Sequence, residues 1–169
     1  MFSEKFRKLP GTYRWLDPQG IHLTLHFLGD VDPEMISKIM QGCQKAVRII
    51  APMRLKFSGC GVFPNFRQPR VFWAGVKGGA KELTALHASL AEQLTVLGLE
   101  LDKRPFSPHL TLARIKFLKK PGPLKQMVEQ NSSEYVGDLE VSKITVYKSE
   151  LTPSGPEYTI LGETYLKGE

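Results

Sequence analysis

Residues 21–28 read IHLTLHFL, and the same four letters, HLTL, return at residues 109–112. In the first copy apolar and polar side chains alternate, which is typical of a β-strand with one face against a core. That alternation puts His22 and Thr24 on one face and the leucines on the other, and the second copy repeats the arrangement. The chain has four histidines, and two of them begin this tetrapeptide. The repeat therefore raises the question of whether the two polar faces belong to one site.

The rest of the chain alternates between strand and helix patterns. Asp32 followed by Pro33 predicts a helix start, because Asp caps well and Pro fits the first turn. The patterns predict strands at residues 12–16, 21–28, 53–63, 70–77, 106–117, 138–149 and 157–166, and helices at 33–50, 80–97 and 122–130. Short turns between neighbouring strands indicate an α+β fold with a largely antiparallel sheet.

Both HLTL stretches are followed by a predicted helix, which suggests two similar lobes. No low-complexity linker separates the halves, so we expect one bilobal domain over residues 1–169. If the two HLTL strands face each other across a cleft, their imidazoles and hydroxyls converge on one small volume.

The composition is that of a globular protein, with 41% hydrophobic and 24% charged residues. The net charge of +6 is compatible with a polyanionic partner, but the basic residues are spread out and form no DNA-binding arm. Cys43 and Cys60 are too isolated for a disulfide framework or a zinc knuckle. No apolar run could span a bilayer, and the N-terminal residues lack the apolar stretch of a signal peptide. A cytoplasmic location without membrane attachment is expected.

A pair of histidines and a pair of threonines suits the chemistry of a phosphodiester. Near neutral pH one imidazole can act as base and the other as acid, while hydroxyls donate hydrogen bonds to phosphate oxygens. This arrangement requires no metal and no cofactor. A single HLTL is explained well enough by a half-buried strand, so it is the second copy that favours a functional interpretation.

The segments HLTLHFLG (22–29) and SPHLTLAR (107–114) resemble the two HxTx motifs of the 2H phosphoesterase superfamily. Within it the chain most resembles the RNA 2′,3′-cyclic phosphodiesterases, also called 2′-5′ RNA ligases, from about Trp15 to Leu166. The resemblance implies a bilobal α+β fold. Its two pseudo-symmetric lobes of mainly antiparallel sheet would carry outer helices and enclose a central cleft holding both motifs.

The resemblance also implies a role for each motif residue. His22 would be the general acid that protonates the leaving 3′ oxygen, and His109 the general base that activates water, giving a 2′-phosphomonoester. Thr24 and Thr111 would hold the phosphate, and Arg114 would add a charged contact. Arg114 stands five residues after His109, and in a regular strand that odd offset directs it to the opposite face. The implied activity is RNA 2′,3′-cyclic 3′-phosphodiesterase, with reversible 2′-5′ ligation as a further activity.

Two departures from the family pattern concern the first lobe. Family members usually begin with a further strand and helix, whereas 14 residues precede Trp15 here. The first lobe is therefore expected to lack its N-terminal strand, with an upstream start or completion by a second chain left open. The protein is otherwise expected to be a monomer. The second departure is His26, which stands where lysine is more usual and shares the polar face of His22; His87 is expected to be a surface or packing residue.

Three alternatives remain open. A metal hydrolase would use His22, His26 and His109, although no carboxylate or cysteine stands nearby in sequence to complete the ligand set. A non-catalytic RNA-binding module would stack bases on aromatic rings. Its candidate rings are Phe63, Phe66 and Phe106. Finally, the substrate could be an RNA terminus, a tRNA fragment or a small cyclic nucleotide.

Overall fold

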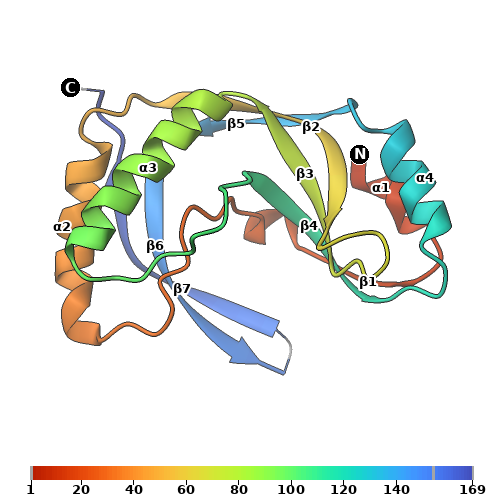
Figure 1. Ribbon diagram of the computed structural model, residues 1–169, viewed down its shortest axis with the longest axis horizontal. Coiled ribbons are helices and arrows are strands. Elements are labelled where there is room, and N and C mark those ends of the chain that lie inside the picture. The colour runs from red at the N-terminus through yellow and green to blue at the C-terminus, as the bar shows by residue number, and fades with distance from the viewer. Residues whose placement is uncertain (1, 154, 169) are drawn as a thin grey trace. The chain divides into compact units, whose positions relative to one another are not determined.

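The computed structural model describes residues 2–153 and 155–168 (Figure 1). Its helices are α1 (Phe2–Arg7), α2 (Ile36–Val47), α3 (Ala80–Val96) and α4 (Gly122–Gln130). Its strands are β1 (Thr12–Trp15), β2 (Met53–Phe63), β3 (Val71–Gly78), β4 (His109–Phe117), β5 (Tyr135–Val141), β6 (Lys143–Thr152) and β7 (Gly155–Tyr165). The predicted α+β class with antiparallel sheet is confirmed.

The chain divides into two compact units built from interleaved segments. The first unit comprises the chain up to Leu25, Leu55–Ala80 and Ser107–Leu139. The second unit comprises the three segments between and after these, beginning at His26, Lys81 and Glu140. Among the described helices, none combines the length and apolar character needed to cross a bilayer.

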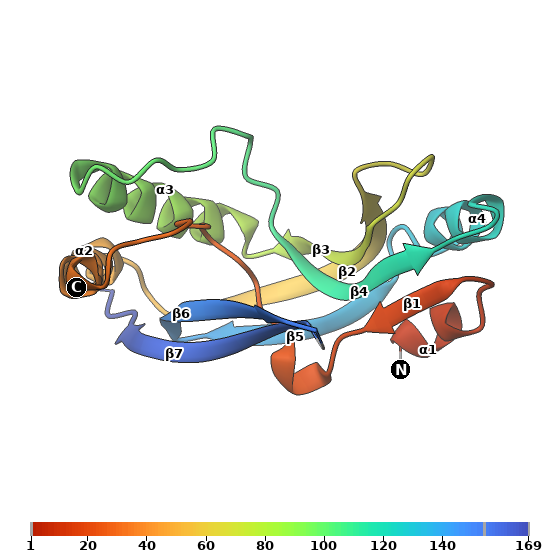
Figure 2. The same cartoon turned by 90° about the horizontal axis from the view of Figure 1, so that it is seen from below.

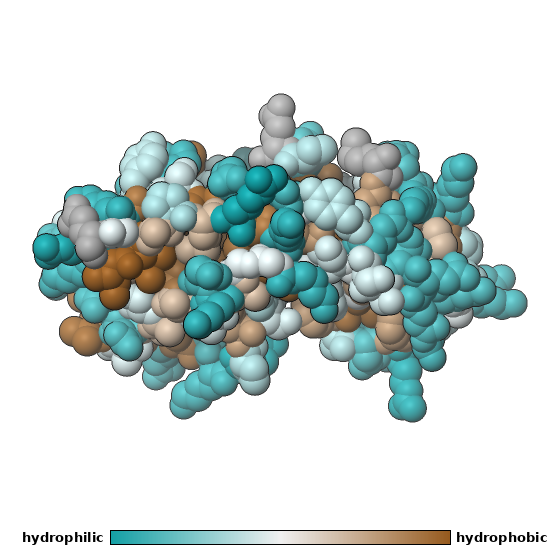
Figure 3. All heavy atoms as spheres, turned by 90° about the horizontal axis from the view of Figure 1, so that it is seen from above, coloured by the Kyte–Doolittle hydropathy of each residue, from teal (hydrophilic) through white to brown (hydrophobic). Residues whose placement is uncertain are grey.

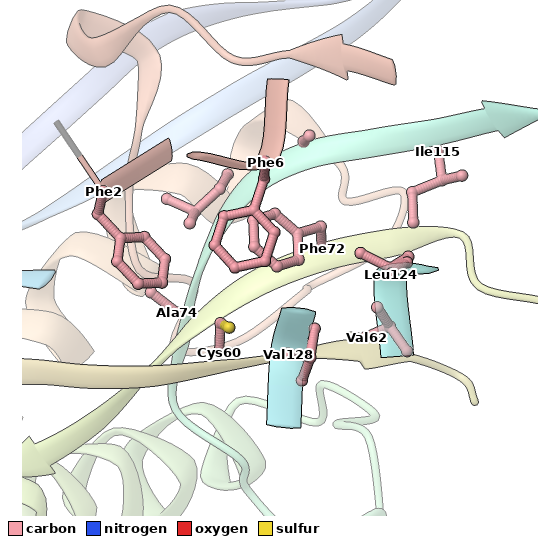
Figure 4. Packing of buried hydrophobic residues seen from close by; sticks show 11 residues of the cluster. Phe2, Phe6, Cys60, Val62, Phe72, Ala74, Ile115, Leu124 and Val128 are labelled. Carbon is pink, nitrogen blue, oxygen red and sulfur yellow. The ribbon is translucent and has the colours of Figure 1, made fainter. Parts of the chain in front are cut away.

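The first unit contains most of a five-stranded sheet with the order β1-β4-β3-β2-β5 (Figure 2). Successive side chains of a strand point to opposite faces, and one face of this sheet is apolar. Helices α1 and α4 pack on that face: Phe6 of α1 contacts Phe72 of β3 with ring centroids 4.5 Å apart, and Leu124 and Val128 of α4 complete the cluster (Figure 4). The other face of the sheet carries the candidate site.

Helix α4 is amphipathic. Leu124 and Val128 are buried, whereas Lys125 and Glu129 form an ion pair of 3.7 Å on the exposed side. Figure 3 shows hydrophilic residues over the part of the surface where α4 lies. Exposed ion pairs of this kind contribute little to stability, so burial of the two apolar side chains is what fixes α4 on the sheet.

Strand β4 contains a β-bulge. Ala113 pairs with Phe72, but the next residue of β3, Trp73, pairs with Thr111. Leu112 therefore has no partner on β3, and the alternation of side chains is shifted by one residue at this point. Consistent with the shift, Leu112 and Ala113 are buried in succession.

In the second unit, helices α2 and α3 pack together, with the Ser89 hydroxyl donating to the Ala46 carbonyl at 3.0 Å. Helix α2 also packs on β7 where Gly162 leaves room for Met40: a Cβ at Gly162 would lie 2.5 Å from the methionine Cε. The predicted cap at Asp32 is present, since its side chain accepts a hydrogen bond from the Glu34 N–H at 3.0 Å, but it begins a 3-10 turn at Pro33–Met35, and α2 itself begins at Ile36.

Three sequence predictions were wrong in detail. Residues 21–28 do not form a regular strand; they make one isolated bridge, between Leu23 and Leu110. The strand predicted at 138–149 is divided between β5 and β6, which belong to different sheets. Helix α1 was missed, since its six residues are too few to show a helical period.

Candidate active site

The first HLTL stretch lies against the edge of β4 that β1 also occupies. β1 follows β4 as far as Leu16, whose N–H donates to the Leu112 carbonyl at 3.0 Å. The chain then makes a short turn at Pro18–Gly20 and returns to β4 where Leu23 bridges Leu110. One edge of β4 is thus bordered twice by the same stretch of chain.

The Leu23–Leu110 bridge is antiparallel, so it determines which polar residues stand opposite each other. In the register that this bridge sets, His22 falls opposite Thr111 and Thr24 falls opposite His109. All four side chains alternate away from the two bridged leucines and share one face of the first unit. We call this group the histidine–threonine square; its two histidines occupy diagonal corners, roughly 7–8 Å apart.

Both histidines are oriented by the same kind of hydrogen bond. His22 Nδ1 lies 3.0 Å from the Gly20 carbonyl oxygen, and His109 Nδ1 lies 2.7 Å from that of Ser107. A carbonyl oxygen only accepts, so Nδ1 carries the proton in each ring. Proton exchange with a substrate therefore falls to Nε2 in both cases.

Two aromatic side chains border His109 on the same face of the sheet. Phe63 meets the imidazole edge-on, with centroids 4.9 Å apart and an interplanar angle of 75°, and the Trp73 centroid lies 6.3 Å away. The indole lies over Gly61, where a Cβ would come within 2.3 Å of Trp73 Cζ2. Glycine at this position therefore leaves the space that the indole occupies beside the square.

The bulge in β4 brings Arg114 to the face of the square. Arg114 pairs with Val71, and Thr111 pairs with Trp73. Val71 and Trp73 are two residues apart on a regular stretch of β3, so they share a face, and so do their partners on β4. The geometric objection from the odd offset is thus removed: Arg114 stands one step beyond Thr111 along the same face.

A pocket of about 240 Å³ adjoins His109 within the first unit. It is lined by Ser58, Gly59, Cys60, Trp73, Gly75, Val76, Lys77, Ser107, Pro108 and Ser132. Trp73 and Ser107 link it to the square, since Trp73 packs near the His109 ring and the Ser107 carbonyl oxygen accepts a hydrogen bond from the His109 Nδ1–H. The pocket offers hydroxyls, a lysine and an indole next to the His109 imidazole.

His26 does not join the square. It belongs to the second unit, where its ring stacks on that of His87 with centroids 4.0 Å apart. Its Nε2 is hydrogen-bonded to the His87 carbonyl oxygen at 2.9 Å. His87 in turn stacks on Phe106 at 3.9 Å. His87 was expected to be a surface or packing residue, and it packs between two rings. Phe106, considered as a stacking surface for a base, is already stacked on His87.

The other candidate groups of the sequence are metal ligands and thiols. Within the described ranges, no group of three or more His, Cys, Asp or Glu residues is positioned to hold a metal ion. Burial raises the pKa of Cys43 to about 11 and that of Cys60 to about 12, which keeps both thiols protonated.

The sequence interpretation missed the aromatic neighbours of His109. Phe63 was considered only as a surface for bases, and Trp73 was assigned no role. The signal available was alternation: Val71, Trp73 and Gly75 share one face of their strand, and glycine adds no side chain to a core face.

Comparison with known proteins places the chain in a family. A sequence model described as the 2′-5′ RNA ligase superfamily matches residues 4–152. A protein of Aquifex aeolicus named RNA 2′,3′-cyclic phosphodiesterase is 36% identical, over 92% of this chain and 82% of its own length. One of the same name from Archaeoglobus fulgidus is 39% identical, over 85% of this chain and 78% of its own.

Solved structures agree with this assignment. A protein of Thermus thermophilus superposes with a TM-score of 0.76 at 31% identity, covering 99% of this chain and 88% of its own. E. coli LigT complexed with 3′-AMP gives 0.72 at 25% identity, covering 96% and 86%. The match extends over nearly the whole chain in sequence and in structure. The chain belongs to the 2′-5′ RNA ligase superfamily and has its 2H phosphoesterase fold.

Proposed function

We propose that this protein is an RNA 2′,3′-cyclic 3′-phosphodiesterase, a phosphoric diester hydrolase that opens the cyclic phosphate at an RNA end. The observation that carries the proposal is the histidine–threonine square, with both Nδ1 atoms hydrogen-bonded to the carbonyl two residues earlier. The relatives from Aquifex aeolicus and Archaeoglobus fulgidus bear the name of that activity, which supports it.

The two histidines divide the proton transfers. His109 Nε2 takes a proton from water as the oxygen attacks phosphorus, and His22 Nε2 gives a proton to the 3′ oxygen as its bond to phosphorus breaks. The 2′ oxygen keeps its bond, so the products are a 2′-phosphomonoester and a free 3′ hydroxyl. The diagonal separation of roughly 7–8 Å supports these roles, because it leaves room for a phosphorus with the entering and leaving oxygens on opposite sides.

The other side chains stabilise the charge on the phosphate. The hydroxyls of Thr24 and Thr111 donate hydrogen bonds to the non-bridging oxygens, where negative charge grows in the transition state. Arg114 adds a charged, bidentate contact from the next position along the same face. Its register on β4, opposite Val71, supports that role.

The same residues would also form a 2′-5′ bond. A 5′ hydroxyl of a second RNA can replace water as the nucleophile, with His109 taking its proton and His22 protonating the 3′ oxygen as before. The product is then a 2′-5′ phosphodiester and a 3′ hydroxyl. The reverse step exchanges the roles of acid and base, which makes ligation and cleavage two directions of one reaction.

The proposal includes independence from metal ions, because the two imidazoles supply both proton transfers. The candidate partner is RNA with a 2′,3′-cyclic terminus, acted on by a monomer. A cytoplasmic location, expected from the sequence, stays a prediction.

The test is to incubate the protein with RNA bearing a 2′,3′-cyclic end, with and without a strong chelator, and to identify the position of the product phosphate. A 2′-phosphate that forms equally with chelator is expected. His22→Gln and His109→Gln should each lose the activity while retaining the fold, and His87→Phe, whose side chain belongs to the second unit, is the matched control. A 3′-phosphate product would exchange the roles of His22 and His109. Binding without product would identify a non-catalytic RNA-binding module. Activity that is lost on adding the chelator would favour the metal hydrolase.

A further inference from the structure

Strand β1 places a second arginine next to the one contributed by β4. In the antiparallel pair β1–β4, Arg14 stands opposite Arg114, one residue before Trp15 meets Ala113. Trp15 packs against the apolar cluster, with its ring centroid 5.9 Å from that of Phe72. Its neighbour Arg14 therefore points to the other face of the sheet. That face also carries the histidine–threonine square.

The polar residues of this face form successive pairs along β4. Thr24 with His109 and His22 with Thr111 make the square, and Arg14 with Arg114 makes the next pair. Each step along the strand is about 6.6 Å. Arg14 therefore lies on the His22 side of β4, about one step beyond the square.

The two arginines bring like charges together on neighbouring strands. Like charges directly opposite each other on two strands are destabilising. Within residues 2–153 and 155–168, neither Arg14 nor Arg114 has an ion pair or a side-chain hydrogen bond, and both are exposed. Arg7, by contrast, pairs with Glu4 at 3.1 Å. Two such guanidinium groups beside a phosphate site form a position for further negative charge.

We propose that Arg14 binds a second phosphate, the 5′ phosphate of the nucleotide whose 2′,3′-cyclic phosphate occupies the square. This inference rests on the proposed function and makes it more specific: the substrate class becomes an RNA strand or a 5′-phosphorylated nucleotide, in preference to a cyclic nucleoside monophosphate with a free 5′ hydroxyl. Arg114 serves the reacting phosphate, and Arg14 the neighbouring one. Guanidinium groups suit this use because they bind phosphate through two parallel hydrogen bonds.

The experiment compares two small substrates that differ only in the second phosphate. One is a nucleoside 2′,3′-cyclic phosphate with a free 5′ hydroxyl, and the other carries a 5′ phosphate in addition. For Arg14→Gln we expect KM to rise about tenfold for the 5′-phosphorylated substrate and to stay unchanged for the other, with kcat retained for both. Arg14→Lys should recover part of the loss, since it restores the charge without the bidentate geometry.

The control is Arg104→Gln, which removes the same charge from a surface position where Arg104 is paired with Asp102. It should affect neither substrate. With a short RNA bearing the cyclic end, Arg14→Gln should also reduce the slope of log affinity against log salt by about 0.7, the value for one lost phosphate contact on a single strand.

The two proposals fail in different ways. If the unaltered protein hydrolyses neither cyclic substrate, the proposed function is wrong. If it hydrolyses both but Arg14→Gln changes their KM values equally, or changes neither, the second phosphate site is wrong and the proposed function stands.

Discussion

Leu23 and Leu110, the second residues of the two HLTL stretches, face each other across an antiparallel bridge in the first unit. This contact places the first motif alongside the second, at the edge of β4. It gives each histidine a threonine directly opposite and the other histidine on the diagonal. Neither motif supplies all four residues of the square by itself, and the bridge is what joins them.

His109→Gln tests the assignment of the base. A general base must be unprotonated to act, so it produces the acidic limb of the pH profile, and the acid produces the alkaline limb. We expect kcat/KM on a cyclic phosphate to fall about 10²–10⁴-fold, with the acidic limb absent from the residual activity. The measurement is kcat/KM across pH, with His22→Gln losing the alkaline limb. A variant that keeps both limbs would show that another group is the base.

Thr111→Val tests the hydroxyl opposite His22. Valine has nearly the shape of threonine but cannot donate a hydrogen bond, so charge on the phosphate oxygen loses one partner. We expect kcat to fall about 10²-fold, as for other donors of this kind, and Thr111→Ser to recover most of the activity. The measurement is kcat and KM for the three proteins. If serine and valine were equally impaired, packing and not the hydroxyl would be responsible.

Gly61→Ala tests whether the Trp73 indole needs the space left by the missing side chain of Gly61. The new Cβ would meet Trp73 Cζ2 at 2.3 Å, so the ring must shift away from its place beside His109. We expect a loss of about 1–3 kcal/mol in unfolding free energy, the usual cost of overpacking, together with reduced kcat.

Gly42→Ala in α2 is the matched control for Gly61→Ala. Its Cβ would lie 3.6 Å from Gln93 Cβ, an ordinary contact, and alanine is favoured over glycine in a helix by about 1 kcal/mol. Urea unfolding should therefore show the two substitutions moving stability in opposite directions. Equal effects would mean that the indole has room to adapt.

The His26–His87 stack predicts a pH dependence of stability. Burial, and then the charge of His26, lower the pKa of His87 below its usual value of about 6.5. A lowered pKa means that the unfolded chain binds more protons than the folded one, so stability is full above the ordinary value and declines as the pH falls below it. His87→Phe keeps a ring between His26 and Phe106 but carries no proton. Urea unfolding near pH 7.5 and near pH 5 should show a smaller acid loss for the variant; an unchanged loss would assign it to other groups.

Part of each unit could be predicted from local pattern. Alternation at His22 and His109 identified the polar faces, and the cap residue Asp32 located the 3-10 turn that leads into α2. The pairing of the two motifs could not be predicted, because an isolated bridge has no periodic signal. The position of Arg114 could not either: the bulge depends on how β4 pairs with β3, and strand pairing between segments distant in sequence is not encoded in the local pattern of either strand.

Leu112, which has no partner on β3, also links the spacing of the second motif to the presence of the bulge. On a bulge-free strand, an arginine sharing the face of His109 would have to occupy position 113 or 115, and position 114 would point into the core. Transplanting the site onto an idealised sheet would thus require moving the arginine by one residue or keeping the bulge. A single-residue deletion at Leu112 would remove the bulge and place the arginine four residues after His109, so the guanidinium would keep the face of His109 on a regular strand.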